Sequence, residues 1–389
     1  MSMQTTDPTD LGFDPARLTR LTTAIAADVA TERYDGAVVL VARGGAVALH
    51  EAVGFADRAA GRKARLDDVF SIFSVTKTLT TATVLMRVDR GELALTTPIA
   101  EILPEFGNRG KQRVTVAQLL THTAGIAIGI PPLPPELLGD LQTYVAAACN
   151  QPLEAIPGTS VHYSAVTAHA LLAEVVRRLD GGTRSFTEIL AADVLAPLGM
   201  HDTALGLRAD LAARKVPVVV RDRTPGIFEP ELLEAFNVIV GPTTEIPAGS
   251  AVSTVADLFR WSETLRRGGE LDGHRLFAPS MVQLATTNHT GDRPNGFYAF
   301  ACEQRGWAPF PAYIGLSFWL RGEGIFPTYF GHTSSPWTFG GLGAGSAMFW
   351  VDPERDLTFV LLTAGLLEET RNLDRCQRLS DLVQAAVVD

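Results

Sequence analysis

The chain has 389 residues, of which 46% are hydrophobic, and this predicts a large buried core divided between two globular parts. The charges sum to −10 without any basic run, which argues against nucleic-acid binding through phosphate contacts. Three widely separated cysteines favour reduced thiols and a cytoplasmic location. The N-terminal residues do not show the basic region followed by an apolar stretch that is typical of a signal peptide, and no segment is apolar enough to span a bilayer. We therefore expect neither export nor membrane insertion.

Both ends of the chain carry patterns typical of helices and hairpins. Apolar residues recur at helical spacing over residues 15–29, directly after an Asp-Pro pair that suits a helix start. A second helix is predicted over residues 366–388. Four β-prone runs separated by short turns cover residues 37–41, 46–49, 346–351 and 357–362. Two terminal hairpins with flanking helices predict one antiparallel sheet covered by helices from both chain ends.

The middle of the chain is predominantly helical in its periodicity. Helices are predicted over residues 75–90 and 167–179, the first ending at a glycine. We therefore predict an α/β (α+β) domain formed by residues 1–72 and 245–389. A mostly helical domain of residues 73–244 would be inserted into it, with the active site at the junction.

A candidate nucleophile lies just before the first central helix. Ser74 and Lys77 form a Ser-x-x-Lys motif, and residues three apart on a helix are neighbours, with Cβ atoms about 5–6 Å apart. A buried lysine can be neutral enough to take a proton from a serine hydroxyl. The alternative is an N-cap serine followed by an exposed lysine, and the motif alone does not decide between the two.

Four ordered motifs favour a reactive serine over a simple N-cap. Together they resemble the serine β-lactamase and penicillin-binding-protein superfamily, in the branch with class C β-lactamases and family VIII carboxylesterases. Residues 73–78 read FSVTKT, and residues 114–125 read VTVAQLLTHTAG. Residues 157–165 read PGTSVHYSA, and residues 340–345 read GGLGAG. The similarity spans roughly residues 15 to 388, and it implies a β-lactamase/transpeptidase-like fold with an antiparallel sheet and an inserted helical domain.

The resemblance also assigns roles to individual residues. Ser74 corresponds to the nucleophile, and Lys77 and Tyr163 to the groups that move its proton, although the sequence leaves open which of the two is the general base. The backbone N–H groups of Ser74 and Ala344 correspond to the oxyanion hole. A dinucleotide-binding turn at residues 341–345 is the weaker alternative, because a strand pattern follows it instead of a helix.

Two departures from the superfamily pattern bear on the substrate. Ala165 stands where the motif usually has an asparagine, which puts efficient β-lactam hydrolysis in doubt. Gly341, Leu342 and Gly343 stand in place of the Lys-Thr-Gly triad, so the groups that would hold a β-lactam carboxylate are missing. The resemblance therefore favours neutral, ester-like substrates, with these three residues among the substrate contacts.

An aromatic-rich stretch over residues 297–339 could wall an apolar pocket, although core strands explain any single aromatic residue there equally well. Within it we expect Trp337 and Phe339, the aromatics nearest the glycine motif, to contact substrate. The proline-rich loop at residues 130–135 is expected to form the opposite rim.

The sequence thus predicts a serine hydrolase that cleaves small-molecule carboxylic esters through an acyl-serine intermediate, without a cofactor or metal. One alternative is a β-lactamase, D-amino-acid peptidase or acyltransferase of the same fold. Another, from a different class, is a non-catalytic scaffold or binding protein. The sequence does not determine the oligomeric state.

Overall fold

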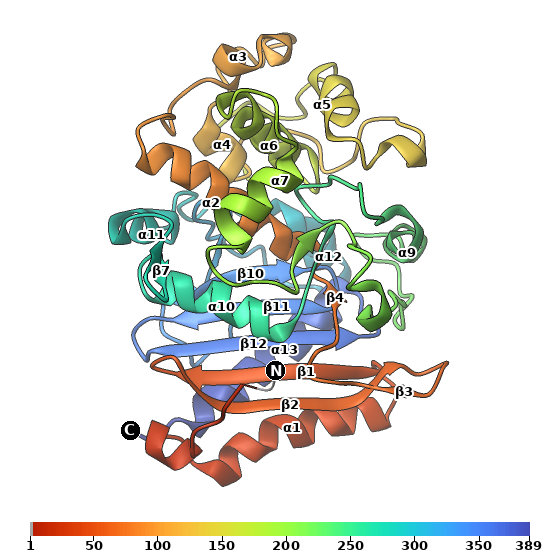
Figure 1. The fold of residues 1–389 in the computed structure, drawn as a ribbon, viewed down its shortest axis with the longest axis vertical. Coiled ribbons are helices and arrows are strands. Elements are labelled where there is room, and N and C mark those ends of the chain that lie inside the picture. The colour runs from red at the N-terminus through yellow and green to blue at the C-terminus, as the bar shows by residue number, and fades with distance from the viewer. Residues whose placement is uncertain (1–2) are drawn as a thin grey trace.

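The computed structural model describes residues 3–389, and a seven-stranded antiparallel sheet lies at its centre (Figure 1). The strand order is β3-β2-β1-β12-β11-β10-β9. The strands are β1 (Gly36–Arg43), β2 (Ala46–Asp57), β3 (Arg62–Lys63), β9 (Trp319–Leu320), β10 (Phe339–Gly343), β11 (Ala347–Asp352) and β12 (Leu357–Ala364). The first and last hairpins meet where β1 pairs with β12, from Gly36 opposite Ala364 to Arg43 opposite Leu357. The predicted joining of the two terminal hairpins into one antiparallel sheet is confirmed.

Helices cover both faces of this sheet. Helices α1 (Pro15–Ala30) and α13 (Glu369–Ala386) pack against each other on one face, and α10 (Val255–Arg266) packs on the opposite face. In β1, Val39 packs in the core on the side of α1 and α13, and Val38 packs in the core on the side of α10, as the two-residue period of a strand requires. Both faces of β1 are therefore buried, which explains why its sequence is a continuous apolar run.

The remaining elements lie between the two terminal hairpins in the chain. The helices are α2 (Thr76–Asp89), α3 (Ile99–Ile102), α4 (Val116–Leu120), α5 (Leu141–Cys149), α6 (Thr167–Leu179), α7 (Phe186–Leu190), α8 (Pro230–Glu234), α9 (Phe236–Ile239), α11 (Pro279–Ala285) and α12 (Ala299–Arg305). The short strands are β4 (Phe70–Ser71), β5 (Ala204–Leu205), β6 (Ala251–Ser253), β7 (Glu270–Leu271) and β8 (His274–Arg275). Figure 1 shows α3 to α7 gathered at one end of the molecule and α1 at the other.

Local sequence signals account for the helix boundaries near the site. The predicted helix over residues 75–90 is α2, and Gly91 follows it with φ of +71°, the left-handed conformation that glycine adopts without strain. The predicted helix over residues 167–179 is α6, with the same bounds. The division into domains at residues 72/73 and 244/245 stays a prediction.

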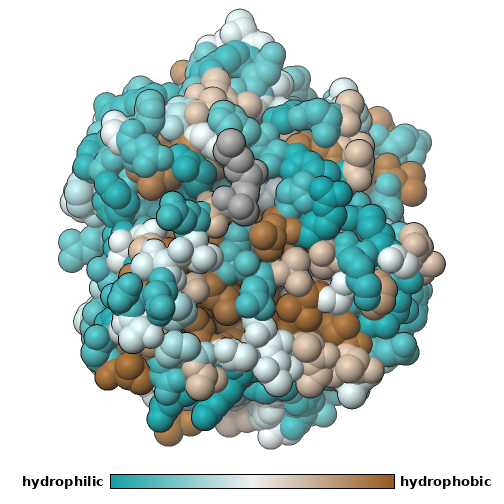
Figure 2. Space-filling model, turned by 60° about the horizontal axis from the view of Figure 1, so that its bottom comes forward, coloured by the Kyte–Doolittle hydropathy of each residue, from teal (hydrophilic) through white to brown (hydrophobic). Residues whose placement is uncertain are grey.

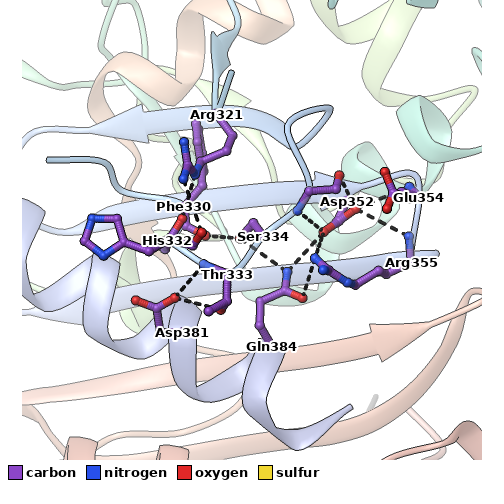
Figure 3. Close-up of polar contacts among 12 residues, drawn as sticks. Arg321, Phe330, His332, Thr333, Ser334, Asp352, Glu354, Arg355, Asp381 and Gln384 are labelled. Atoms are coloured by element: carbon purple, nitrogen blue, oxygen red, sulfur yellow. Dashed lines mark hydrogen bonds and ion pairs between the residues drawn. The ribbon is translucent and has the colours of Figure 1, made fainter. Parts of the chain in front are cut away.

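A buried polar network fixes the long loop between β9 and β10 (Figure 3). Asp352, on β11, is fully buried and accepts hydrogen bonds from the backbone N–H of Ser335 at 3.0 Å and from its hydroxyl at 2.7 Å. Gln384 reaches the same carboxylate from α13 at 3.2 Å, and Arg355 reaches it at 3.1 Å. Because every side of the carboxylate is paired, the network holds the loop rigidly against α13.

The surface is mostly hydrophilic on the face drawn in Figure 2. Hydrophobic side chains are gathered in the lower half of that face. None of the helices within residues 3–389 combines the length and the apolar character needed to cross a lipid bilayer.

Candidate active site

Ser74 occupies a tight turn at the start of α2. The turn, Phe73–Val75, is a short 3-10 helix that runs directly into α2, so Ser74 lies where helical N–H groups favour negative charge. Phe73 has φ of +44°, an uncommon conformation for a residue with a side chain. Strain of this kind persists only where the surroundings enforce it, and it turns the serine hydroxyl toward the cavities described below.

Lys77 lies one helical turn beyond Ser74 and is 3% exposed. Its Nζ atom lies 3.0 Å from Ser74 Oγ, 2.8 Å from the carbonyl oxygen of Ala165 and 3.0 Å from that of Ala248. Burial lowers the pKa of Lys77 from 10.5 to about 7. A neutral amine has two N–H groups and one lone pair, so this set of neighbours satisfies it when the two carbonyls accept and Ser74 donates.

Tyr163 completes a three-residue cluster from a loop 89 residues further along the chain. Its hydroxyl lies 2.8 Å from Ser74 Oγ, and its ring lies 5.0 Å from Lys77 Nζ. Burial raises the pKa of the Tyr163 hydroxyl above its ordinary value, with the hydrogen bond to Ser74 a smaller opposing effect. The phenol is therefore protonated near neutral pH, as a proton donor requires.

The motif at residues 114–125 supports the tyrosine loop. His122 has φ of +56°, accepts the N–H of Ser164 at Nδ1 (3.2 Å), and accepts the N–H of His162 at its carbonyl oxygen (2.8 Å). Its ring lies 4.6 Å from the Tyr163 ring. Burial, and secondly the charge of Lys77, lowers the pKa of His122 to about 3, so the imidazole is a neutral support for Tyr163.

The glycine motif lets β10 approach the serine turn closely. A Cβ atom on Gly343 would lie 2.3 Å from the carbonyl oxygen of Ile72, and one on Gly341 would lie 2.5 Å from the Phe349 ring. Only glycine fits at both positions. Ala344 follows in the turn and lines two cavities together with Ser74, and within residues 3–389 its N–H has no hydrogen-bond acceptor. That N–H is thus free to bind a developing oxyanion.

Three cavities contain Ser74. One of them, beside Lys77 and Tyr163, has a volume of only about 10 Å³, about the room of one water molecule, so it is too small for part of a substrate. The other two meet at Ser74 and are large enough to matter for substrate. The larger has a volume of about 300 Å³ and mostly apolar walls, and the smaller has a volume of about 30 Å³. Ser74, Ala344 and Phe228 line both. Apart from Lys77, no lysine or arginine within residues 3–389 lines a cavity that contains Ser74.

The structure brings most of the predicted site residues together. Lys77 Nζ and the Tyr163 hydroxyl both lie within hydrogen-bonding distance of Ser74 Oγ. The cavities that contain Ser74 are also lined by Gly341, Leu342, Gly343 and Ala344. Ile130, from the loop expected to form a rim, lines the larger cavity.

Trp337 and Phe339 are placed elsewhere, against the expectation that they contact substrate. Trp337 is 69% exposed, and both residues line a separate cavity of about 770 Å³ that does not contain Ser74. Ser74 lies at the Ala344 end of β10, and Phe339 begins that strand. At roughly 3.3 Å per residue, five residues separate them by roughly 16 Å.

Several residues at the site have no signal in the sequence analysis. Trp319 and Phe297 pack on Tyr163, with ring centroids 6.0 and 4.6 Å away, whereas the sequence marked only their aromatic-rich segment. Glu369, on α13, lines the smaller cavity and is 4% exposed. The carbonyls of Ala165 and Ala248 could not be found from residue type, because every residue carries the same group.

Comparison with known proteins identifies the family and the fold of the chain. A family model described as Beta-lactamase matches residues 21–381. Esterase EstB of Burkholderia gladioli is 36% identical over 220 residues, which are 52% of this chain, and the match spans about half of EstB (55%). Among solved structures, a penicillin-binding protein homolog from Caulobacter crescentus has a TM-score of 0.79 at 26% identity, covering 96% of this chain and 99% of that one. A family VIII carboxylesterase shares the fold, with a TM-score of 0.77 at 23% identity over 96% of this chain and 99% of its own.

Proposed function

The chain belongs to the Beta-lactamase family, and from this premise we propose that it is a serine hydrolase that cleaves neutral carboxylic esters through an acyl intermediate on Ser74. The observation that carries the proposal is the contact of Ser74 Oγ with both Lys77 Nζ and the Tyr163 hydroxyl. Nucleophilic catalysis by a serine needs one group that accepts its proton and one that donates a proton to the leaving group, and the buried Lys77 and Tyr163 suit these two roles.

Acylation follows from these positions. Neutral Lys77 takes the proton from Ser74 Oγ as the oxygen bonds to the ester carbon. The negative charge that develops on the carbonyl oxygen is held by the N–H groups of Ser74 and Ala344, each worth about 3–4 kcal/mol in such sites. When the bond to the alcohol oxygen breaks, that oxygen takes the Tyr163 proton, and the phenolate is reprotonated from the Lys77 ammonium.

Deacylation reverses the roles. A water molecule loses a proton to Lys77 and attacks the acyl carbon. The bond to Ser74 Oγ then breaks, the serine oxygen takes the Tyr163 proton, the Lys77 ammonium returns a proton to the phenolate, and the carboxylic acid leaves. Lys77 is proposed as the base instead of a Tyr163 phenolate, because burial lowers the pKa of the lysine and raises that of the tyrosine. Both changes favour the neutral pair.

The charge of the site supports ester hydrolysis over β-lactam or peptide-carboxylate chemistry. Lys77, the proposed neutral base, is the single lysine or arginine that lines the cavities of Ser74 in the described chain, and Glu229 and Glu369 also line them. An anionic substrate would be desolvated beside these carboxylates without a partner. We expect nitrocefin turnover far below ester turnover.

The test compares Ser74→Ala with Ser71→Ala, a nearby buried serine without a lysine three residues later. Wild type and Ser71→Ala should give a burst of p-nitrophenol from p-nitrophenyl butyrate, and a fluorophosphonate should label the peptide that carries Ser74. Ser74→Ala should lose both. Equal hydrolysis by Ser74→Ala, or an unlabelled wild type, would contradict the proposal, and the second result would favour a non-catalytic protein.

We also propose a reducing, cytoplasmic setting for this activity. Cys149, Cys302 and Cys376 are all buried and free, which suits a compartment that keeps thiols reduced. Thiol titration of the purified protein after unfolding under non-reducing conditions should count three free thiols.

A further inference from the structure

The cavities of about 300 Å³ and about 30 Å³ that meet at Ser74 divide any bound ester into two parts, because the third cavity at Ser74, of about 10 Å³, holds no more than a water molecule. Ser74 and Ala344 line both cavities, so the ester carbon that Ser74 attacks lies at their junction, with its oxygen toward the two N–H groups. The two remaining substituents of that carbon, the acyl chain and the alcohol oxygen, must then extend into different cavities.

Proton transfer decides which substituent enters which cavity. The alcohol oxygen needs a proton as it leaves, and the donor is the Tyr163 hydroxyl, 2.8 Å from Ser74 Oγ. Tyr163 lines the smaller cavity and does not line the larger one. The alcohol therefore lies in the smaller cavity and the acyl chain in the larger.

The cavities differ in size and chemistry. The acyl cavity, of about 300 Å³, has predominantly aliphatic and aromatic walls that include Tyr144, Leu233, Phe236, Ile239 and Ile246. The alcohol cavity is about a tenth as large, at about 30 Å³, and polar side chains line part of it. These polar residues are Tyr298, Tyr329, Glu369 and Asn372.

Glu369 is a buried hydrogen-bond acceptor in the alcohol cavity. One of its oxygens accepts the backbone N–H of Ile227 at 3.1 Å, and no lysine, arginine or histidine within residues 3–389 forms an ion pair with it. A carboxylate offers about four lone-pair sites, so it retains the capacity to accept from a ligand. Burial raises the pKa of Glu369 to about 7, which is the expected result of a carboxylate without a cation.

We propose that the preferred substrates are esters of an apolar acid with a short alcohol that carries a second hydroxyl group, which donates a hydrogen bond to Glu369. This inference rests on the proposed ester hydrolysis and specifies its substrate class. The apolar cavity binds the acid by burial of its chain, and the small cavity excludes long alcohols. The carboxylate selects a donor because a hydrogen bond to a charged acceptor is stronger than one to a neutral acceptor.

The first test uses two esters of identical composition, ethyl hexanoate and hexyl acetate. They differ only in which side of the ester carries the long chain. We expect kcat/KM for ethyl hexanoate to exceed that for hexyl acetate by at least about tenfold, measured by pH-stat on the wild-type protein. Equal values or the reverse order would overturn the assignment of the cavities.

The second test compares 2-hydroxyethyl hexanoate with propyl hexanoate, in which a methyl group replaces the terminal hydroxyl. At pH 8.5, where Glu369 is mostly ionised, the hydroxyl ester should be favoured by at least about tenfold in kcat/KM, as expected for a hydrogen bond to a charged acceptor. In Glu369→Gln the ratio should fall to about threefold or less, because a neutral amide is the weaker acceptor. Asp374→Asn, which removes the same charge from an exposed position of α13, should keep the wild-type ratio.

The outcomes separate this inference from the function on which it rests. Failure of every ester together with an unlabelled Ser74 would contradict ester hydrolysis itself. Hydrolysis of all four esters without the two preferences, in a protein whose Ser74 is labelled, would contradict only the substrate class. A ratio unchanged in Glu369→Gln would contradict the role of that carboxylate.

Discussion

The reactivity of Ser74 should depend on pH through Lys77. Burial lowers the pKa of this lysine from 10.5 to about 7, and no carboxylate among the described residues opposes the change. At pH 7 about half of the buried amines are then neutral, against about 0.03% for an ordinary lysine, a gain of about 10³-fold in available base. Below pH 7 the neutral fraction should fall about tenfold for each pH unit.

The assay is the rate of fluorophosphonate labelling between pH 5.5 and 9.5, which reports the nucleophile without depending on substrate fit. We expect the rate to rise about tenfold per pH unit at low pH and to level off above an inflection near 7. Lys77→Arg, whose guanidinium stays protonated, should lose at least about 10³-fold. Lys111→Arg is the matched control, since Lys111 is also buried but binds Asn108 and the Gln151 carbonyl away from Ser74.

Two results would refute this reasoning. A labelling rate that is flat over this range, or one that inflects near 10, would show that Lys77 is not the neutral base. An active Lys77→Arg variant would do the same. An independent check is stability: since the unfolded chain binds the proton more tightly, the free energy of unfolding should gain from this group as pH rises from about 7 toward 10.5, and Lys77→Met should lack that gain.

Three further changes test other parts of the site. Gly343→Ala places a Cβ atom 2.3 Å from the Ile72 carbonyl oxygen, so we expect the free energy of unfolding, measured in urea, to fall by about 1–3 kcal/mol. We also expect kcat to fall about 100-fold, because the Ala344 N–H of the oxyanion hole moves. An unchanged kcat would contradict the close approach of β10 to the serine turn. Phe236→Trp should narrow the acyl cavity, so that kcat/KM falls more for octanoate than for acetate esters, and a uniform fall would argue against that location of the chain. Asp352→Asn should cost about 2–4 kcal/mol at pH 7. Burial opposes ionisation of Asp352, but the hydrogen bonds from Ser335 prevail and lower its pKa, so wild type should lose this advantage as pH falls below about 3.8, and a difference that does not depend on pH would contradict the role of the charge.

Local signals in the sequence determined the elements that carry the site. The apolar period of residues 15–29 predicted α1, and four β-prone runs separated by short turns predicted the sheet. Family membership confirms the resemblance drawn from four motifs. The contact between Ser74 and Lys77 was also predictable, because residues three apart on one helix are neighbours whatever the tertiary fold.

Only tertiary structure decided what surrounds that pair. Two backbone carbonyls, from Ala165 and Ala248, complete the environment of Lys77, and a carbonyl carries no mark in the sequence. Trp337 was expected at the site because it is close to the glycine motif in sequence, but residues along an extended strand are separated by about 3.3 Å each, and Trp337 lines a different cavity. Glu369, far from Ser74 in sequence, lines a cavity with it because α13 packs nearby. The contact between Ser74 and Lys77 is thus local, whereas the shape and polarity of the cavities at Ser74 arise from packing between segments hundreds of residues apart.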